Sequence, residues 1–218
     1  MVAAKLGGSD EAANPRLRAA TLKARQNSMP RENIERAVKK GAGELEGMTY
    51  EEGVYEGYGP GGIAIMVEVL TDKKSRTVPE LKSLFKTNGG TMAEANAVAY
   101  LFDKKGLILV EGDNITEDAV MEIALDAGAE DIEKDDDKVY AVKTSVNDFH
   151  AVLAAMEPKV TAKGFKITES GLKYIPQSTI TVEGEKGKEA LELIDALEEH
   201  DDVQNVYTNL ELTDSLMA

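Results

Sequence analysis

The chain has 218 residues, of which 42% are hydrophobic, and it contains neither cysteine nor tryptophan. Forty acidic side chains outnumber 25 basic ones, which gives a formal net charge of −15 at pH 7. The lack of cysteine excludes a disulfide scaffold, a cysteine-ligated zinc site and thiol catalysis. No apolar run approaches the roughly 18 residues of a membrane span, so we expect a soluble globular protein of one to three small domains.

Positive charge is concentrated near the amino end. Residues 1–49 carry nine basic and six acidic side chains, a net charge of +3, whereas residues 50–218 carry a net charge of −18. Phosphate binding requires lysine and arginine gathered where they displace counterions. The asymmetry therefore excludes a protein that coats nucleic acid with its whole surface, and it raises the possibility that the amino-terminal part alone binds a polyanion.

The first elements are expected to be two helices. Asn14-Pro15 pairs a capping residue with proline at the first helical position, where the missing N–H costs no hydrogen bond, and predicts a helix over 15–26. Met29-Pro30 precedes a second helix, which Gly41 ends. Further glycines then indicate a linker, so we expect a basic helical domain over residues 1–48, called the head below.

The rest of the chain, called the body below, mixes strands and helices. Strict apolar alternation predicts a strand over 63–70, and a shorter candidate spans 54–58. Thr77-Val78-Pro79-Glu80 resembles a capping box at the start of a helix over 78–88. Further strands are expected at 98–102, 179–182 and 203–208, with a helix over 186–199. Together these elements have the order βαββαβ.

A second βαββαβ unit lies between them. It comprises strands near 107–110, 131–132, 139–142 and 165–172, a helix over 116–127 and a helix that begins near Phe149. This order is typical of the ferredoxin-like fold. The sequence therefore predicts an α+β protein: a small N-terminal helical domain, followed by an α+β domain of residues 49–104 plus 177–218 with a ferredoxin-like α+β domain of residues 105–176 inserted in it.

Several motifs invite a chemical interpretation that their context does not favour. Residues 57–62 fit the dinucleotide-binding pattern G-x-G-x-x-G, but a second strand follows instead of a helix, which favours a tight strand connection where Tyr58 could contact a protein partner. His150 and His200 each lack a second ligand four residues away. Asp135-Asp136-Asp137 lacks the alternation of a calcium loop and favours a solvated hairpin turn. We therefore expect no metal, no cofactor and no enzymatic activity, although no spacing excludes a catalytic site.

The basic residues of the head are the strongest candidates for a binding site. Arg36, Lys39 and Lys40 share one side of a helix, because they are spaced three and four residues apart. The predicted nucleic-acid-binding residues are Arg16, Arg18, Lys23, Arg25, Arg31, Arg36, Lys39 and Lys40. Guanidinium groups can hold phosphates in a bidentate manner. The alternative is an ordinary solvated face, since Glu32 and Glu35 lie among these residues and no base-reading element is evident.

Five segments of the chain resemble the YebC/PmpR family. They are NPRLR (14–18), MPRENIERAVKKGAGELEG (29–47), YEGYGPGG (55–62), LTDKKSRT (70–77) and NGGTM (88–92). The resemblance implies a helical N-terminal domain followed by two α+β domains, one inserted in the other. Family members usually start earlier, with a basic GHSKW-type segment. This chain is therefore either a truncated form or a member that lacks part of the family's cationic surface.

The resemblance also implies a function. Its members are generally described as cytoplasmic transcriptional regulators that bind DNA, and relatives, including mitochondrial ones, act as translational activators on ribosomes. We therefore expect a non-enzymatic DNA-binding regulator of transcription, with a ribosome- or RNA-associated translation factor as the alternative. The acidic body is expected to meet a protein partner, and no membrane is involved. A ligand-sensing or protein-interaction module is a further class, which a pocket lined by convergent polar groups would favour.

Overall fold

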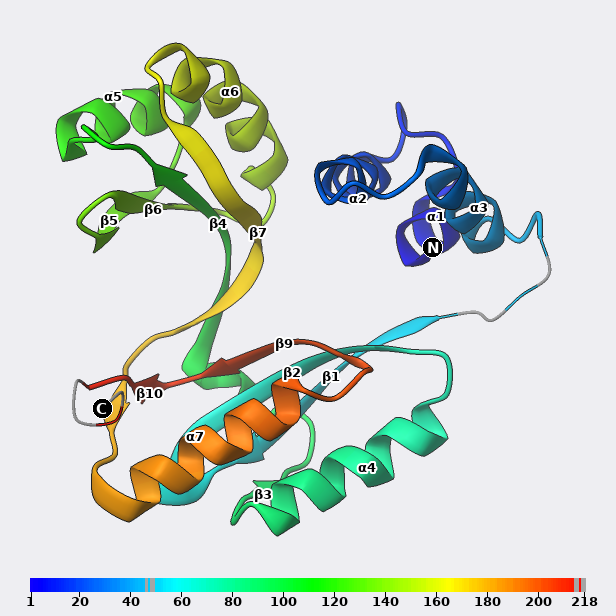
Figure 1. The fold of residues 1–218 in the computed structure, drawn as a ribbon, viewed down its shortest axis with the longest axis vertical. Coiled ribbons are helices and arrows are strands. Elements are labelled where there is room, and N and C mark those ends of the chain that lie inside the picture. The colour runs from blue at the N-terminus through cyan, green and yellow to red at the C-terminus, as the bar shows by residue number, and fades with distance from the viewer. Residues whose placement is uncertain (46, 48–49, 214–215, 217–218) are drawn as a thin grey trace. The chain divides into compact units, whose positions relative to one another are not determined.

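A computed structural model describes residues 1–45, 47, 50–213 and 216, and the chain forms two compact units (Figure 1). One unit joins Met1–Tyr100 to Ser178–Ala218, and the other is the continuous segment Leu101–Gln177. The α+β class is confirmed, because each unit combines helices with a four-stranded antiparallel sheet. The inserted unit begins at Leu101 instead of residue 105. The predicted boundary between residues 48 and 49 lies outside the described residues, as does Glu46.

No helix among the described residues has the length and apolar character needed to cross a membrane.

Three helices form the head: α1 (Val2–Gly7), α2 (Pro15–Gln26) and α3 (Arg31–Gly41). The second and third confirm the prediction. Helix α1 is an addition that the sequence did not reveal, because it has only six residues and no capping side chain. Its Ala3 and Ala4 are buried against Leu17 of α2, with Val38 of α3 packed beside them.

Asn14 connects two of these helices and is itself 5% exposed. Its Oδ1 accepts a hydrogen bond from the Leu17 N–H at 3.0 Å, which caps α2. Its Nδ2 donates to the carbonyl oxygens of Ala3 at 2.8 Å and Gly8 at 2.9 Å. One buried amide therefore starts α2 and holds the end of α1 against it.

Replacing Asn14 with alanine is expected to destabilise the head by about 2 kcal/mol, because a helix cap and two further hydrogen bonds are lost. Hydrogen exchange of the α1 and α2 amides in the full chain measures this effect. The control is Asn27→Ala, which removes an exposed hydrogen bond to the Lys23 carbonyl. Its effect should stay within about 0.5 kcal/mol. If the α1 and α2 amides are equally protected against hydrogen exchange in the two variants, Asn14 does not have the role assigned to it.

The sheet of the first unit has the strand order β3-β1-β2-β9. Its strands are β1 (Glu51–Tyr58), β2 (Ala64–Thr71), β3 (Thr91–Met92) and β9 (Val203–Thr208). Helices α4 (Lys74–Thr87) and α7 (Gly184–Glu198) cover one face of this sheet (Figure 1). Alternate residues of β2 point into the shared core, which includes Ile65, Val67, Val69, Leu81, Phe85, Ala190, Leu193 and Leu197.

Two strand predictions for this unit are wrong. Residues 98–101 do not form a strand, and Phe102 begins β4 (Phe102–Glu111) of the second unit. Ala99–Leu101 is a 3₁₀ turn, η2, because the buried Glu56 carboxylate accepts hydrogen bonds from the N–H groups of Asn96, Val98 and Ala99 at 2.7 to 2.8 Å. These N–H groups are therefore not available to a sheet. The predicted strand at 179–182 is the two-residue β8 (Ile180–Thr181), which pairs only with β10 (Leu210–Glu211). Strand β1, and not residues 179–182, pairs with β2 on the side away from β9.

The predicted capping box at Thr77 is also wrong. Helix α4 begins at Lys74, one turn earlier, and Thr77 is buried inside it. Its hydroxyl lies 2.6 Å from Asp202 Oδ2 and 2.8 Å from Thr71 Oγ1. Asp202 also accepts a hydrogen bond from Arg76 at 2.9 Å. The hydroxyl thus joins the start of α4 to the segment before β9 and does not cap a helix.

The second unit has the predicted βαββαβ order. Its elements are β4 (Phe102–Glu111), α5 (Glu117–Ala127), β5 (Asp131–Asp136), β6 (Val139–Thr144), α6 (Phe149–Ala162) and β7 (Lys166–Pro176). The strand order is β5-β6-β4-β7. Ile108, Val142 and Met156 belong to a buried core that α5 and α6 share with one face of the sheet. By strand alternation, Lys105 and Lys143 lie on the opposite face together with Leu107 and Leu109.

Candidate nucleic-acid interface

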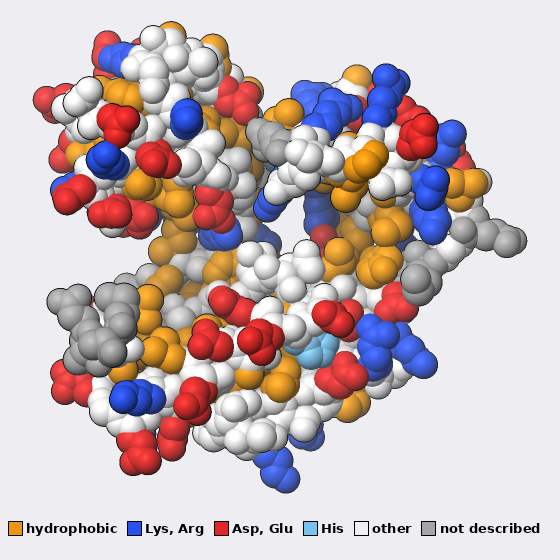
Figure 2. Space-filling view, in the orientation of Figure 1, with side chains coloured by type: hydrophobic (Ala, Val, Ile, Leu, Met, Phe, Trp, Pro, Cys, Tyr) orange, Lys and Arg blue, Asp and Glu red, His pale blue; other side chains and the backbone are white. Residues whose placement is uncertain are grey.

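The candidate site consists of the basic side chains of the head, which Figure 2 shows as a group of lysine and arginine side chains over the helices. The structure divides the eight predicted residues into two groups. Four are held by partners within the chain: Arg16, Arg18, Arg25 and Arg31. The other four have no hydrogen bond or ion pair from their side chains to any described residue: Lys23, Arg36, Lys39 and Lys40. We call this second group the unpaired cations.

Three of the arginines in the first group are paired with carboxylates. Arg25 pairs with Glu11 at 3.3 Å and Arg31 with Glu35 at 2.7 Å, while Arg16 pairs with Glu52 at the start of β1. The Glu52 hydrogen bond raises the pKa of Arg16. All three guanidinium groups are at least half exposed. Exposed ion pairs contribute little to stability, so a phosphate could replace these carboxylates, but these arginines are not free in the structure.

Arg18 has a structural role instead. Its guanidinium donates hydrogen bonds to the carbonyl oxygens of Glu11 at 3.0 Å and Ala12 at 2.7 Å. It therefore fixes the loop before α2. Sequence spacing could not reveal this contact, because the loop carbonyls lie within reach of Arg18 only after α2 has formed.

Helix α3 carries three of the unpaired cations on its solvent side. Ile34 is buried and Val38 is partly buried, and these residues define the face that packs in the head. With 100° per residue, Arg36, Lys39 and Lys40 lie on the opposite side. Lys39 and Lys40 are in the last turn, where the helix dipole also favours positive charge. Arg36 and Lys39 are exposed on this side of the helix, and Lys40 is half-buried beside them.

Two further residues modify this surface. Lys5, in the last turn of α1, is exposed and has no side-chain hydrogen bond or ion pair to a described residue. Sequence reasoning missed it as a site residue because α1 itself was not predicted. Glu32 is exposed one turn before Arg36 and reduces the positive potential there. The surface therefore remains cationic, but less strongly than the arginine and lysine count suggests.

The head has no aromatic side chain, since residues 1–45 contain no Phe, Tyr, Trp or His. Proteins that bind single strands without sequence preference use aromatic rings on which bases stack. Lysine and arginine on a helix instead contact phosphates, which position a protein on a duplex or a folded RNA. The chemistry of the head therefore suits the backbone of a structured nucleic acid.

Tyr58 lies at the end of β1 and is 40% exposed. Its hydroxyl donates a hydrogen bond to the carbonyl oxygen of Ala97 at 3.0 Å. The following glycines form the short 3₁₀ turn η1 (Pro60–Gly62), and Gly61 and Gly62 have φ values of 76° and 81°, which favour glycine. The turn leads directly into β2, so the tight strand connection is confirmed. The Tyr58 hydroxyl is engaged by Ala97, so the exposed part of this side chain is its ring.

The remaining motifs have structural roles. His200 lies 3.1 Å from Glu80, and the ring of His150 packs edge-on against Phe149. The acidic run after residue 134 forms the hairpin between β5 and β6, where Lys134 pairs with Asp137 at 2.8 Å. Within the described ranges, no three His, Asp or Glu side chains are grouped closely enough to hold a metal ion.

Comparison with known proteins gives two family matches that together cover most of the chain. Residues 1–44 match the model of the TACO1/YebC protein N-terminal domain, and residues 50–210 match that of the TACO1/YebC second and third domain. A crystal structure of a conserved hypothetical protein from Aquifex aeolicus has a TM-score of 0.87 at 39% identity. The match covers 100% of this chain and 88% of that one.

Curated bacterial relatives are similar over nearly the same span. A protein of Syntrophobacter fumaroxidans is 49% identical over 100% of this chain and 86% of its own length. A protein of Leptospira biflexa is 52% identical over 97% of this chain and 84% of its own length. Both are named probable transcriptional regulatory proteins. The chain therefore belongs to the TACO1/YebC family.

Proposed function

We propose that this protein is a non-enzymatic regulator of gene expression that binds structured nucleic acid through its head, as a transcriptional regulator on duplex DNA. The observation that carries the proposal is the set of unpaired cations on α2 and α3, in a head of net positive charge joined to an acidic body. Exposed cations without internal partners can neutralise phosphates at no cost in broken ion pairs. The names of the curated relatives support a role in transcription.

A translation factor bound to ribosomal RNA is the second candidate. It is supported by the composition of the unpaired cations, three lysines and one arginine on two different helices, which suits contacts with phosphates. Phosphate contacts alone carry no sequence information. A target recognised by its shape, such as folded RNA, would suit this surface as well as a promoter would.

The acidic body has a different part in the proposal. Its net charge of −18 repels a polyanion, so we expect it to orient the head or to meet a protein partner, with the exposed Tyr58 ring as one contact. Both candidate functions would be carried out in the cytoplasm. The proposal includes no catalytic role.

Salt-titrated binding of the full chain to duplex DNA and to purified ribosomes separates the two candidates. A DNA regulator should retain a preferred duplex in the presence of excess random competitor, because specific binding exceeds non-specific binding by a factor of about 10³ or more. A translation factor should bind ribosomes tightly and all duplexes equally weakly. Failure to bind either target at low salt would contradict the proposed function as a whole.

A further inference from the structure

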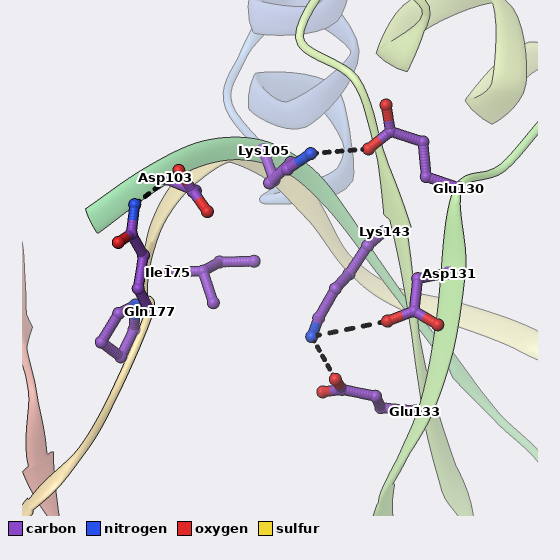
Figure 3. Close-up of a pocket in the computed structure, with 9 residues that line it drawn as sticks. Asp103, Lys105, Glu130, Asp131, Glu133, Lys143, Ile175 and Gln177 are labelled. Atoms are coloured by element: carbon purple, nitrogen blue, oxygen red, sulfur yellow. Dashed lines mark hydrogen bonds and ion pairs between the residues drawn. The ribbon is translucent and has the colours of Figure 1, made fainter. Parts of the chain in front are cut away.

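An ion pair between Arg16 and Glu52 joins the head to the body. Arg16 belongs to α2, and Glu52 lies 36 residues later, at the start of β1. The other ion-paired arginines of the head have partners inside the head. Lys143 of the second unit also pairs within its own sheet, and Figure 3 shows it beside Asp131 and Glu133 of the adjacent strand β5. The Arg16 pair, in contrast, holds a helix of the head to a strand of the body.

Glu52 lies on the sheet face of the first unit that is opposite α4 and α7. Tyr55 and Val67 pack in the core on the helix side, so strand alternation places Glu52 and Glu68 on the other face. The ladder pairs Glu68 with Val54, two residues from Glu52, which makes the two glutamates diagonal neighbours. Diagonal neighbours lie within reach of one long side chain. We call Glu52 and Glu68 the acidic pair.

Both members of the acidic pair act on Arg16. The pKa of Arg16 is raised, first by the hydrogen bond to Glu52 and then by the charges of Glu52 and Glu68, against the effect of burial. Glu68 Oε2 accepts hydrogen bonds from Asn205 Nδ2 at 3.0 Å and from the Tyr207 hydroxyl at 2.9 Å. These donors are neutral, so they fix the carboxylate and leave its negative charge in place. The acidic pair therefore offers a guanidinium the kind of anionic oxygens that a phosphate offers.

The side of α2 that carries Arg16 also carries Lys23, one of the unpaired cations. The two residues are two turns apart, about 10 Å along the helix. A nucleic acid that places a phosphate at Lys23 brings its backbone towards Arg16, and its phosphates repel the acidic pair. The Arg16 and Glu52 side chains are 50% and 45% exposed, and exposed ion pairs contribute little to stability. A phosphate can thus replace Glu52 at small cost.

We propose that the acidic pair competes with nucleic acid for Arg16. In the free protein, Glu52 and Glu68 hold the head through this side chain. A bound phosphate takes their place and releases the head from the sheet. The inference rests on the proposed function of the head and adds a regulation to it: the body lowers the affinity of the head, because binding must first break this contact.

A double-mutant cycle on duplex DNA tests the competition. Glu52→Gln should lower the Kd of a labelled duplex by about twofold to fivefold, the range expected from one exposed ion pair. In the Arg16→Gln background the same change should leave the Kd unchanged, because no contact remains to be broken. The control is Glu94→Gln, an exposed acid after β3, which removes the same charge and should not alter the Kd. An equal gain from Glu52→Gln in both backgrounds would indicate general repulsion of the duplex and overturn the proposal.

Spin labels test the same contact without nucleic acid. The chain has no cysteine, so Ala20→Cys in α2 and Lys82→Cys in α4, both at exposed positions, provide two unique labels. Double electron–electron resonance should give a narrow distribution of label distances, which Glu52→Gln and bound duplex should each broaden. A distribution that Glu52→Gln leaves unchanged overturns the inference, while the proposed function stands. If no variant binds duplex DNA or ribosomes, the proposed function fails, and the competition fails with it.

Discussion

Replacing Asp202 with alanine is expected to destabilise the first unit by about 2 to 3 kcal/mol. Asp202 is 7% exposed, and its carboxylate accepts hydrogen bonds from Arg76 and from the Thr77 hydroxyl. Its loss leaves a buried hydroxyl with only weak acceptors and removes a charge-assisted pair. The contact joins α4 to the chain just before β9, so the effect should appear as faster hydrogen exchange in both elements.

Asp72→Ala is the matched control. Asp72 pairs with the same Arg76 side chain at 3.1 Å, but from an exposed position two residues before α4. Its removal should change the stability by no more than about 0.5 kcal/mol. If Asp72→Ala and Asp202→Ala increase hydrogen exchange by the same factor, the buried network does not have the role described here.

The contribution of Asp202 should also depend on pH. Burial raises the pKa of this carboxyl, but the hydrogen bonds from Thr77 and Arg76 outweigh burial, and the net shift is downward. A lowered pKa in the folded state means that the stabilisation is complete above the ordinary Asp pKa of about 3.9 and is lost as the pH falls through the lower folded value. The difference in the free energy of unfolding between the wild type and Asp202→Ala should therefore decrease only when the pH falls below about 3.9.

Changing the four unpaired cations to glutamine is expected to have the largest effect on nucleic-acid binding. If Lys23, Arg36, Lys39 and Lys40 each contact one phosphate, the slope of log K against log salt falls by up to about 3.6 on B-DNA. Between 50 and 200 mM salt, the wild type would then lose about 150-fold more affinity than the variant does. Fluorescence anisotropy with a labelled duplex measures both quantities.

A control variant with the same change in net charge tests whether binding depends on the local surface of the head or on the overall charge of the protein. Lys134, Lys138, Lys159 and Lys163 are exposed lysines of the second unit, each paired with a carboxylate. Their replacement by glutamine also removes four positive charges. It should leave the salt slope unchanged, because paired lysines on an acidic surface are not expected to contact phosphate.

Helices α2 and α3 of the head and the elements of the inserted unit could be predicted because local signals decide them. Asn14-Pro15 sets the start of α2, and the helical spacing of Phe149, Val152 and Met156 identifies the buried face of α6. Strand β1 could not be assigned its partners in this way. Which strand lies beside β2 depends on contacts between residues that are distant in sequence. The hydrogen bonds from the N–H groups of Asn96, Val98 and Ala99 to the buried Glu56 carboxylate likewise have no local sequence pattern.

The sequence could identify the basic residues of the candidate site, but not which of their side chains are held by other residues of the chain. Charge and helical spacing identified eight of the nine basic residues of the head and missed Lys5. The partners of Arg16 and Arg18 are 36 residues away in β1 and in a loop before the helix, respectively, so spacing could not show that these two side chains are held.

The salt dependence of binding is the most direct test that the unpaired cations of the head form the contact with nucleic acid. The slope should be steep for the wild type, should be clearly flatter when Lys23, Arg36, Lys39 and Lys40 are glutamine, and should be unchanged in the lysine control. Identical slopes for the wild type and the head variant, measured on duplex DNA and on ribosomes, would show that the contact lies elsewhere.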